Sequence, residues 1–473
     1  MPAAGATVSF PGGRRGILAA SSAAVLLPLA VGALVPAGVQ LPAAPTASAN
    51  AARSAAPGSM LPESASIMPV RFQASAGAAG NDVHRIRTRR IGVSVLQMGD
   101  SHTAADRFAD AVRQVLWRKF GAGGIGYLSV GTPHPGVRSN LLKVSGSSGW
   151  RYDGIQRSTH TDAFGLSGFN ASTSSEGETL SFAGSNPEPY ARVELEVRIG
   201  PDAGSIIVEI DDEPRLKASL AATKPGTRII EVPAPAGGGA FRKLILRTGE
   251  AKPVTVSALG VFREGKGVTY SSVGFPGATI DVIGRFTQTV LREDLARLAP
   301  DIVVLAFGTN EGFDAKLDLV AYRDRYLSAI REIRAALPKA RLVMIGPPQG
   351  ERPLPACKPA EGQPCLPPTP AVDHPAPADG EGACPQRPAQ LDKVRAVQRR
   401  IAEAERIPFW DWWAIMPGGC GASRWAAADP ALMAKDHVHF TKAGYRKGGE
   451  SFAAFIEPEV RAAFRGEDAV SND

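Results

Sequence analysis

The sequence predicts an α/β protein, an open parallel sheet with helices on both faces and an antiparallel β-sandwich inserted into it. Apolar strands alternate with amphipathic helices after residue 266, and one strand–helix pair of the same kind precedes residue 145. Between them, short segments alternate apolar and polar residues with a period of two, as antiparallel strands do. We therefore expect a discontinuous α/β domain over 89–144 and 267–465, the sandwich over 145–266, and a tail over 466–473.

The first part of the α/β domain begins with an apolar run, Ile91–Met98, that suits a buried strand. After Ser101, apolar residues recur every three or four positions, which predicts one amphipathic helix: Phe108, Val112, Val115, Leu116 and Phe120. We interpret Gly121–Gly126 as a loop. It spells G-x-G-x-x-G, but it follows a helix rather than a strand, so a dinucleotide site is not indicated.

The insert contains four clear runs of alternating character, each bounded by Gly, Pro or Asp. They are Val193–Ile199, Ile206–Ile210, Phe241–Leu246 and Val254–Phe262. In the second part of the α/β domain, helices and buried strands alternate again. Helices are expected over Ile283–Leu298, Tyr322–Leu337, Leu391–Glu405 and from about Thr441, and strands over Ile302–Phe307, Leu342–Ile345 and Ile407–Trp410. Residues 347–388 contain too much proline for regular structure.

The first 49 residues have the pattern of an export signal. Arg14 and Arg15 precede an uncharged apolar stretch, and Ala47-Ser48-Ala49 provides the small residues that a signal peptidase cuts. An uncleaved membrane anchor is the alternative, because the apolar stretch could reach the ~20 residues needed to span a bilayer. Residues 50–88 are predicted to be a flexible linker. We expect the protein in the periplasm or cell envelope, with membrane contact only if the signal remains uncleaved.

Composition excludes several classes of protein. Charged residues make up 21% and hydrophobic residues 44% of the 473 positions, as in ordinary soluble chains and unlike polytopic membrane proteins. The net charge of +7 is spread along the chain without a nucleic-acid-binding motif, so no nucleic-acid partner is expected. The four cysteines, Cys357, Cys365, Cys384 and Cys420, predict two disulfides in an exported protein. Any of three pairings is possible, and the competing zinc site lacks a C-x-x-C pair.

Four short motifs lie in order at the expected edge of the parallel sheet, the edge at which open α/β sheets bind ligands. Gly99-Asp100-Ser101-His102 places a serine at a helix N-terminus, where free backbone N–H groups can stabilise an oxyanion. Gly277 could offer another N–H group, and Asn310, directly after a strand, its side-chain amide. Taken singly, each is also an ordinary cap or loop residue.

The fourth motif is Asp436-His437-Val438-His439. The Asp-x-x-His spacing lets one tight turn bring the Asp436 carboxylate onto the His439 imidazole, which fixes its tautomer and stabilises its charged form. His437 is too close to Asp436 in sequence to be oriented in the same way. Two histidines without a third ligand do not predict a metal site.

In this order the four motifs resemble the blocks of the SGNH/GDSL hydrolase family, whose fold is a flavodoxin-like parallel sheet flanked by helices. The resemblance implies that Ser101 is the nucleophile and that His439 and Asp436 are the general base and its orienting acid. It also implies that Ser101, Gly277 and Asn310 form the oxyanion hole, and that no metal or organic cofactor is needed.

Three further features resemble the peptidoglycan O-acetylesterases of bacterial envelopes: histidine after the Gly-Asp-Ser, the glycine-rich 121–126 segment, and the insert, which in those enzymes is similar to a carbohydrate-binding module. This resemblance implies a serine esterase whose partner is an acetylated polysaccharide, peptidoglycan or another envelope glycan. Two alternatives stay open. One is a polysaccharide O-acetyltransferase that uses the same triad, and the other is a non-catalytic glycan-binding protein.

Overall fold

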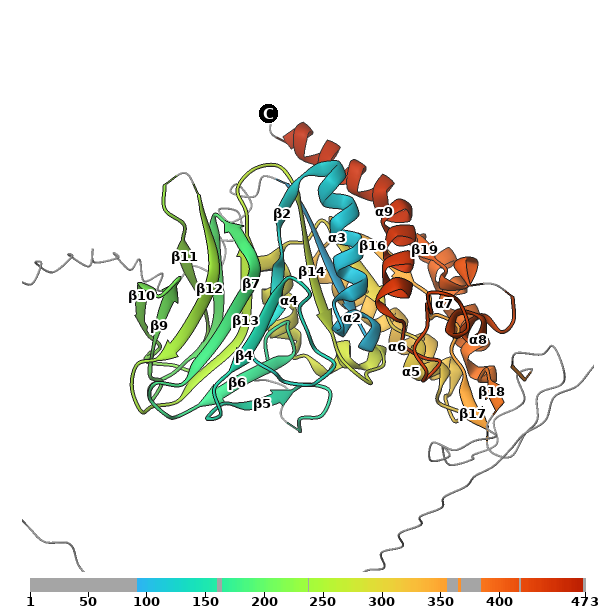
Figure 1. Cartoon of the computed structure of the whole chain (residues 1–473), viewed down its shortest axis with the longest axis horizontal. Coiled ribbons are helices and arrows are strands. Elements are labelled where there is room, and N and C mark those ends of the chain that lie inside the picture. The colour runs from blue at the N-terminus through green and yellow to red at the C-terminus, as the bar shows by residue number, and fades with distance from the viewer. Residues whose placement is uncertain are drawn as a thin grey trace, which may run out of the picture. The chain divides into compact units, whose positions relative to one another are not determined.

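The computed structural model of the chain describes residues 92–159, 164–236, 238–354, 365–366, 384–416 and 418–470 (Figure 1). The predicted signal (1–49), the predicted linker (50–88) and Cys357 lie outside the described residues. Within the described ranges, no helix has both the length and the apolar character that a membrane span requires.

A six-stranded sheet forms the centre of the α/β domain, and all its strands pair in parallel. The strand order is β19-β16-β15-β1-β14-β2. The strands are β1 (Val93–Gly99), β2 (Ala122–Gly124), β14 (Val268–Gly274), β15 (Ile302–Ala306), β16 (Arg341–Ile345) and β19 (Phe409–Trp410). Strand β1 lies between β14 and β15, so the loops that follow all three strands meet at one point. The predicted parallel sheet is confirmed.

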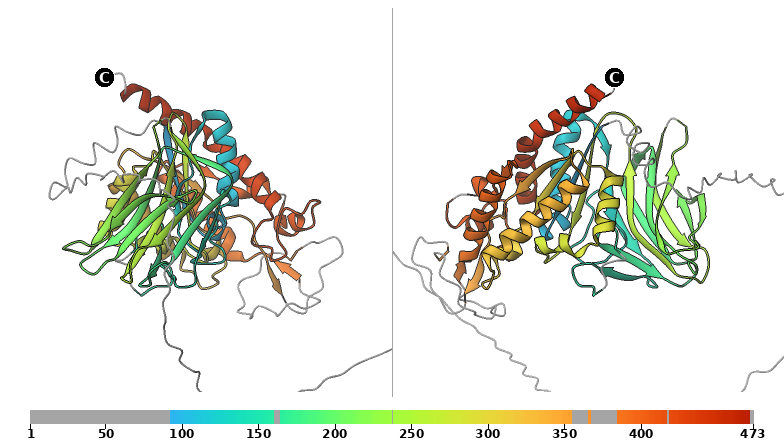
Figure 2. Two further views of the ribbon diagram at one scale, coloured as in Figure 1. Left: turned by 60° about the vertical axis from the view of Figure 1, so that its left-hand side comes forward. Right: turned by 180° about the vertical axis from the view of Figure 1, so that it is seen from behind.

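Helices cover both faces of this sheet (Figures 1 and 2). Helices α3 (Arg107–Phe120) and α9 (Lys442–Val470) lie side by side on one face, and the other face carries α4 (Gln288–Leu298), α6 (Leu319–Ala336) and α7 (Ala389–Ala404). Helix α9 extends into the range 466–473 that was expected as a tail. The two faces bury separate apolar clusters, and this burial is the main stabilising term of such a layered fold.

Two of the predicted helices are each divided in the structure. After Ser101 the chain forms a short α2 (Ser101–Ala104) before α3, because Asp106 adopts a left-handed conformation with φ of 56° between them. The Asp106 carboxylate is buried and pairs with Arg113 of α3, 2.5 Å away, which holds the break in place. Likewise, a 3₁₀ helix, η1 (Ile280–Arg285), precedes α4.

The prediction that Gly121–Gly126 is a loop is wrong, because most of this segment is in strands. β2 is an edge strand of the parallel sheet, and β3 (Gly126–Ser129) pairs with β13 (Val254–Phe262) of the insert. Glycine allows both pairings, since a Cβ on Gly124 would lie 2.5 Å from the Val261 carbonyl oxygen and Gly124 has φ of +125°. A side chain here would separate the two backbones.

The proline-rich region 347–388 also contains regular structure that was not predicted. β17 (Arg352–Leu354) pairs in antiparallel fashion with β18 (Cys384–Gln386), and Pro353 lies opposite Pro385. A two-stranded ribbon tolerates proline because each strand has a free edge for the position that lacks an N–H group.

The insert is a sandwich of two antiparallel sheets (Figure 1). One has the order β10-β9-β12-β7-β4, and the other has the order β11-β8-β13-β6-β5, with β3 also on β13. The strands not yet given are β4 (Leu142–Gly146), β5 (Arg151–Gly154), β6 (Phe169–Thr173), β7 (Thr179–Tyr190), β8 (Arg192–Ile199), β9 (Ser205–Ile210), β10 (Glu213–Ser219), β11 (Gly226–Pro233) and β12 (Gly239–Thr248). Alternate residues of the two sheets fill one apolar core.

Helix α4 joins the insert to the α/β domain through charged side chains. Arg297 of α4 lies 3.5 Å from Glu196 and 3.8 Å from Glu194, both on β8. On the same helix, the Asp294 carboxylate accepts a hydrogen bond from the Leu166 N–H group of the insert (3.0 Å). Burial raises the pKa of Glu196 and of Asp294 above their ordinary values. These contacts fix the insert against the helix layer.

Candidate active site

Three loops are tied together at the carboxyl end of β1. The Phe275 N–H group, after β14, donates to the Gly99 carbonyl (2.8 Å), and the Asp100 N–H group donates to the Ala306 carbonyl of β15 (3.2 Å). A Cβ on Gly99 would lie 2.6 Å from that same Ala306 oxygen, so only glycine permits this approach. The backbone therefore brings the loops that carry Ser101, Gly277 and Asn310 next to one another.

Ser101 is the first residue of α2, and Asp100 is its N-cap. The Asp100 carboxylate accepts from the His102 N–H group (2.9 Å), which satisfies one of the free donors at the start of the helix. Burial raises the pKa of Asp100 to about 6, although hydrogen bonds from His102 and Thr309 act in the opposite direction. The partly exposed Ser101 hydroxyl is thereby held at the rim of the sheet.

The structure brings Ser101, His439 and Asp436 into one hydrogen-bonded chain. Ser101 Oγ lies 2.9 Å from His439 Nε2, and His439 Nδ1 lies 2.8 Å from Asp436 Oδ2. The side chains of His439 and Asp436 are 42% and 50% exposed, so a substrate can reach them. The imidazole is thus placed to accept the Ser101 proton while the carboxylate faces its other nitrogen.

The His439–Asp436 pair shifts the pKa of each partner so that its charged form is favoured. The hydrogen bond that the His439 ring donates to Asp436 raises the pKa of His439 above its ordinary value, against a smaller opposing effect of burial. Partial burial would raise the pKa of Asp436, but hydrogen bonds from the His439 ring and from the N–H groups of Val438 and His439 hold it far below its ordinary value. Asp436 is therefore ionised at neutral pH, as a partner of an imidazolium must be.

The turn that carries His439 is held by the backbone and by aromatic packing. The Ala434 N–H group donates to the His439 carbonyl (2.8 Å), and Met433 forms a β-bridge with Phe440. The buried Phe440 ring stacks on Trp412, with ring centroids 4.7 Å apart. The segment 433–440 is thus an anchored hairpin, and α9 begins directly after it.

Gly277 and Asn310 lie together on the other side of Ser101. Asn310 Nδ2 donates one hydrogen bond to the Ala278 carbonyl (2.7 Å), which leaves its second N–H free. Gly277 has φ of +77°, and neither its N–H group nor that of Ser101 makes a hydrogen bond among the described residues. Within the described residues, two backbone donors and one amide N–H therefore remain without an acceptor in the loops that follow β1, β14 and β15.

Glu311 is a site residue that the sequence analysis missed. Its buried carboxyl accepts from the Ile280 N–H group (2.8 Å), so α5 (Thr309–Gly312) holds the loop containing Gly277 at two points, Ala278 and Ile280. Burial raises the pKa of Glu311 to about 8, which favours its protonated form. The signal available in the sequence was an acidic residue directly after Asn310, but nothing local distinguishes a buried acid from a solvated one.

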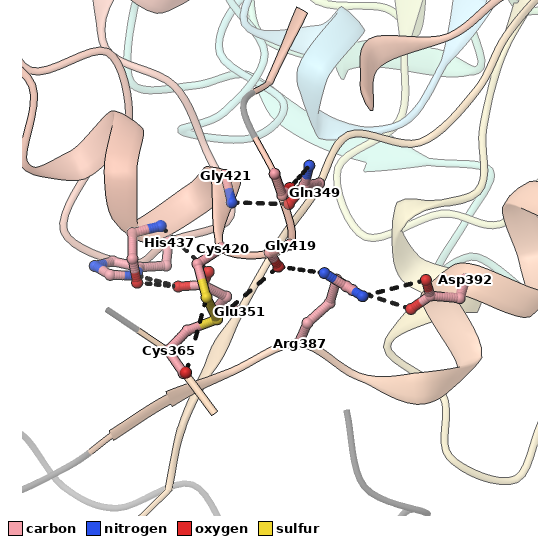
Figure 3. The surroundings of a disulfide bond; sticks show 11 residues. Gln349, Glu351, Cys365, Arg387, Asp392, Gly419, Cys420, Gly421 and His437 are labelled. Atoms are coloured by element: carbon pink, nitrogen blue, oxygen red, sulfur yellow. Dashed lines mark hydrogen bonds and ion pairs between the residues drawn. A yellow bond between two sulfur atoms is a disulfide. The ribbon is translucent and has the colours of Figure 1, made fainter. Parts of the chain in front are cut away.

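His102 and His437 have partners other than Asp436. His102 is buried, its Nδ1 lies 3.1 Å from the Tyr445 hydroxyl, and burial lowers its pKa to about 3, so it stays neutral. His437 has φ of 54°, and its Nδ1 lies 2.8 Å from Glu351, as Figure 3 shows. Within the described ranges, no group of three or more His, Cys, Asp and Glu side chains is arranged to hold a metal ion.

A disulfide between Cys365 and Cys420 lies beside this second histidine (Figure 3). It confirms one of the predicted disulfides and removes both cysteines as zinc ligands. Cys420 precedes α8 (Gly421–Ala426), whose Ser423 hydroxyl donates to Glu351 (2.5 Å). The disulfide therefore links the proline-rich region to α8, which contacts the 436–439 turn through Ser423 and Glu351.

Comparisons with known proteins identify the family of one region and the fold of the chain. Residues 256–447 match the GDSL-like Lipase/Acylhydrolase family. The fold is similar to a solved peptidoglycan O-acetylesterase, with 25% identity and a TM-score of 0.61 over 80% of this chain and 95% of that one. No curated protein matches the sequence.

Two other solved structures match with lower sequence identity and lower TM-scores. A family two carbohydrate esterase from Clostridium thermocellum in complex with cellohexaose has 13% identity and a TM-score of 0.29, and covers 62% of this chain and 95% of its own. A GDSL-like lipase from Bacteroides thetaiotaomicron has 20% identity and a TM-score of 0.27, and covers 41% of this chain and 76% of its own. The family match and the structural match over 80% of this chain lead to one conclusion. The chain carries a GDSL-like acylhydrolase domain and is an esterase of the SGNH/GDSL type.

Proposed function

We propose that the protein is a serine esterase that removes O-acetyl groups from an envelope polysaccharide, peptidoglycan, through an acyl-enzyme on Ser101. The observation that carries this proposal is the hydrogen-bonded chain from Ser101 Oγ through His439 to Asp436. It lies beside three hydrogen-bond donors and is open to solvent on one side. This is the set of groups that ester cleavage by a serine requires.

In acylation, Ser101 Oγ attacks the acetyl carbonyl carbon, and His439 Nε2 takes the hydroxyl proton. The negative charge that develops on the carbonyl oxygen is stabilised by the N–H groups of Ser101 and Gly277 and by the free N–H of Asn310. The bond from the carbonyl carbon to the sugar oxygen then breaks, and His439 gives its proton to the leaving alkoxide. Asp436 stays ionised and stabilises the imidazolium between these two transfers.

In deacylation, a water molecule replaces the sugar. His439 takes a proton from the water, which attacks the acetyl group on Ser101, and the same donors hold the second oxyanion. The bond to Ser101 Oγ breaks, His439 returns the proton to Ser101, and acetate leaves. No step needs a group other than side chains, backbone N–H groups and water.

Two observations support an envelope polysaccharide as the substrate. The structural similarity to the peptidoglycan O-acetylesterase extends over 80% of this chain, which is more than the α/β domain alone and so includes the insert. The apolar segment after Arg14 and Arg15, with the disulfide between Cys365 and Cys420, supports export to an oxidising compartment. An alkaline phosphatase fusion after Asn50 should be active if this localisation is right.

The test of the function is acetate release from O-acetylated peptidoglycan and turnover of an aryl acetate. Ser101→Ala and His439→Ala should each reduce both activities by a factor of at least about 10³, because the nucleophile or its base is lost. His437→Ala is the matched control, since His437 faces Glu351 rather than Ser101. Near-wild-type turnover in Ser101→Ala would refute the proposal.

A further inference from the structure

A cavity of about 300 Å³ lies where the insert meets the domain that carries Ser101. On the α/β side, Ala104 of α2 and Ser272 and Gly274 of β14 line it. On the insert side, the wall is formed by β3, β4 and the segment between them. Figure 1 labels α2, β4 and β14 in this region. The volume is at the lower end of the range for small-molecule sites, which suits one sugar residue or a substituent on it.

The wall of this cavity is in contact with the ester-cleaving site. The Arg138 N–H group donates to the Ala104 carbonyl (3.0 Å), and Ala104 ends the short helix that Ser101 begins. In the same segment, a Cβ on Gly136 would lie 3.3 Å from Pro276 Cγ, and Pro276 directly precedes Gly277. The segment that forms the cavity wall is therefore hydrogen-bonded to α2, which carries Ser101, and lies next to Pro276, the residue before Gly277.

The charges on the cavity wall do not cancel. Neither Arg138 nor Lys143 forms an ion pair among the described residues, and Arg138 uses only Nε, which donates to the Pro135 carbonyl (2.8 Å). One acid, Asp106, also lines the cavity. Its carboxylate is already bound by the buried Arg113 and by the Asn140 N–H group (2.8 Å). Two positive charges thus remain without a partner.

The uncharged polar groups of the wall are rich in hydrogen-bond donors. His134 Nδ1 accepts from the Gly136 N–H group (2.9 Å), so the ring proton is on Nε2, which can donate. Burial and the nearby Arg157 lower the pKa of His134, which keeps the ring neutral. The hydroxyl groups of Ser129 and Thr132 add two further donors. Together these groups match a ligand that carries negative charge and several acceptor oxygens.

We propose that this cavity binds a carboxylate-bearing part of the glycan while the acetyl ester is at Ser101. Arg138 and Lys143 pair with the carboxylate, and His134 donates to a neighbouring oxygen. The cavity then selects anionic acetylated glycans over neutral ones such as acetylated xylan. This inference rests on the proposed esterase function and names the class of substrate for that site.

The test compares Lys143→Glu with the matched variant Lys217→Glu. Lys217 lies on β10, is exposed and does not line the cavity. Rates of acetate release are measured on O-acetylated peptidoglycan, on acetylated xylan and on an aryl acetate. In Lys143→Glu, the ratio of kcat/KM for peptidoglycan to kcat/KM for the aryl acetate should fall about fivefold to tenfold, because the KM for peptidoglycan rises. The effect is of this size because a partly exposed charge pair is weak, while reversing the charge adds repulsion. Lys217→Glu should keep the wild-type ratio.

Two further measurements separate this inference from the proposed function. Added NaCl should raise the wild-type KM for peptidoglycan but not for acetylated xylan, because salt screens charge pairs. Binding of Ser101→Ala to insoluble peptidoglycan should weaken when Lys143→Glu is added, a readout that does not need catalysis. If the wild-type protein does not turn over the aryl acetate but this binding difference is present, the esterase function alone is contradicted. An unchanged substrate ratio and unchanged binding in Lys143→Glu would overturn the cavity assignment.

Discussion

Replacing Asp436 by asparagine removes the negative charge of this side chain and leaves its size almost unchanged. Asp436 Oδ1 accepts from the N–H groups of Val438 (3.0 Å) and His439 (2.9 Å), and an asparagine oxygen can keep both bonds. The position of Oδ2, 2.8 Å from His439 Nδ1, would then hold an NH₂ group. This group donates to Nδ1, so the ring proton moves to Nε2, the atom that must accept from Ser101. The turn is preserved, but the tautomer is wrong.

The magnitude follows from the distance and the exposure of the pair. At 2.8 Å, Coulomb's law gives about 6 kcal/mol at an effective dielectric constant of ~20 and about 1.5 kcal/mol at ~80. About half of each side chain is exposed, so solvent screening favours the lower part of this range, about 2 to 3 kcal/mol. That is a factor of roughly 30 to 150 in rate. With the added cost of the unproductive tautomer, we expect Asp436→Asn to reduce kcat/KM on the order of 10³-fold.

The pH profile gives a second readout of the same change. His439 acts as a base only when it is neutral, and its hydrogen bond to Asp436 raises its pKa. Wild-type kcat/KM should therefore rise with pH through a midpoint above 6.5. Without the carboxylate the neutral form appears at lower pH, and the midpoint of Asp436→Asn should shift downward.

The assay for both effects is aryl acetate hydrolysis between about pH 5 and 9. Asp324→Asn is the control, because Asp324 is an exposed acid on α6 whose ion pair is with its neighbour Arg323. A loss smaller than about tenfold, or an unshifted midpoint, would show that Asp436 does not support His439.

Three further predictions concern stability. Burial raises the pKa of Glu311 from 4.5 to about 8, so the folded state favours the protonated carboxyl, and the free energy of unfolding that it contributes should fall as pH rises from about 4.5 to about 8. In urea unfolding, Glu311→Gln should therefore show a flatter pH dependence than the wild type. Parallel curves for the two proteins would contradict this. Arg113→Met should lower the free energy of unfolding by about 3 to 5 kcal/mol, because it leaves the Asp106 carboxylate buried without its ion-pair partner. A loss below about 1 kcal/mol would show that the fold does not need this ion pair. Replacing both Cys365 and Cys420 by alanine opens a cross-link between residues 55 positions apart and should cost about 2 to 4 kcal/mol in the same measurement, with an unchanged midpoint as the contrary result.

Much of the fold could be predicted because its signals are local. The apolar run at Ile302–Phe307 and the helical spacing in Tyr322–Leu337 depend only on burial of one face, and the structure has β15 and α6 at these places. Errors arose where backbone contacts override local pattern. Gly121–Gly126 has no apolar periodicity, yet its four glycines let it pair with strands that follow more than 120 residues later. The break between α2 and α3 depends on a buried ion pair between Asp106 and Arg113 that no periodicity indicates.

The sequence by itself determined which groups could take part in ester chemistry. The Ser101 and Asn310 motifs follow predicted strands, parallel strands end at the same edge of a sheet, and the Asp-x-x-His spacing pairs an acid with a histidine. Ser101 and His439 are 338 positions apart, and their 2.9 Å contact confirms that the sheet order places the two motifs together. Only the tertiary structure decided the supports and the surroundings of these groups. Glu311 holds the Gly277 loop, Glu351 binds His437, and the insert forms one wall of a cavity that Ala104 of α2 also lines. Burial and charge compensation depend on partners distant in the chain, so a local pattern cannot specify them.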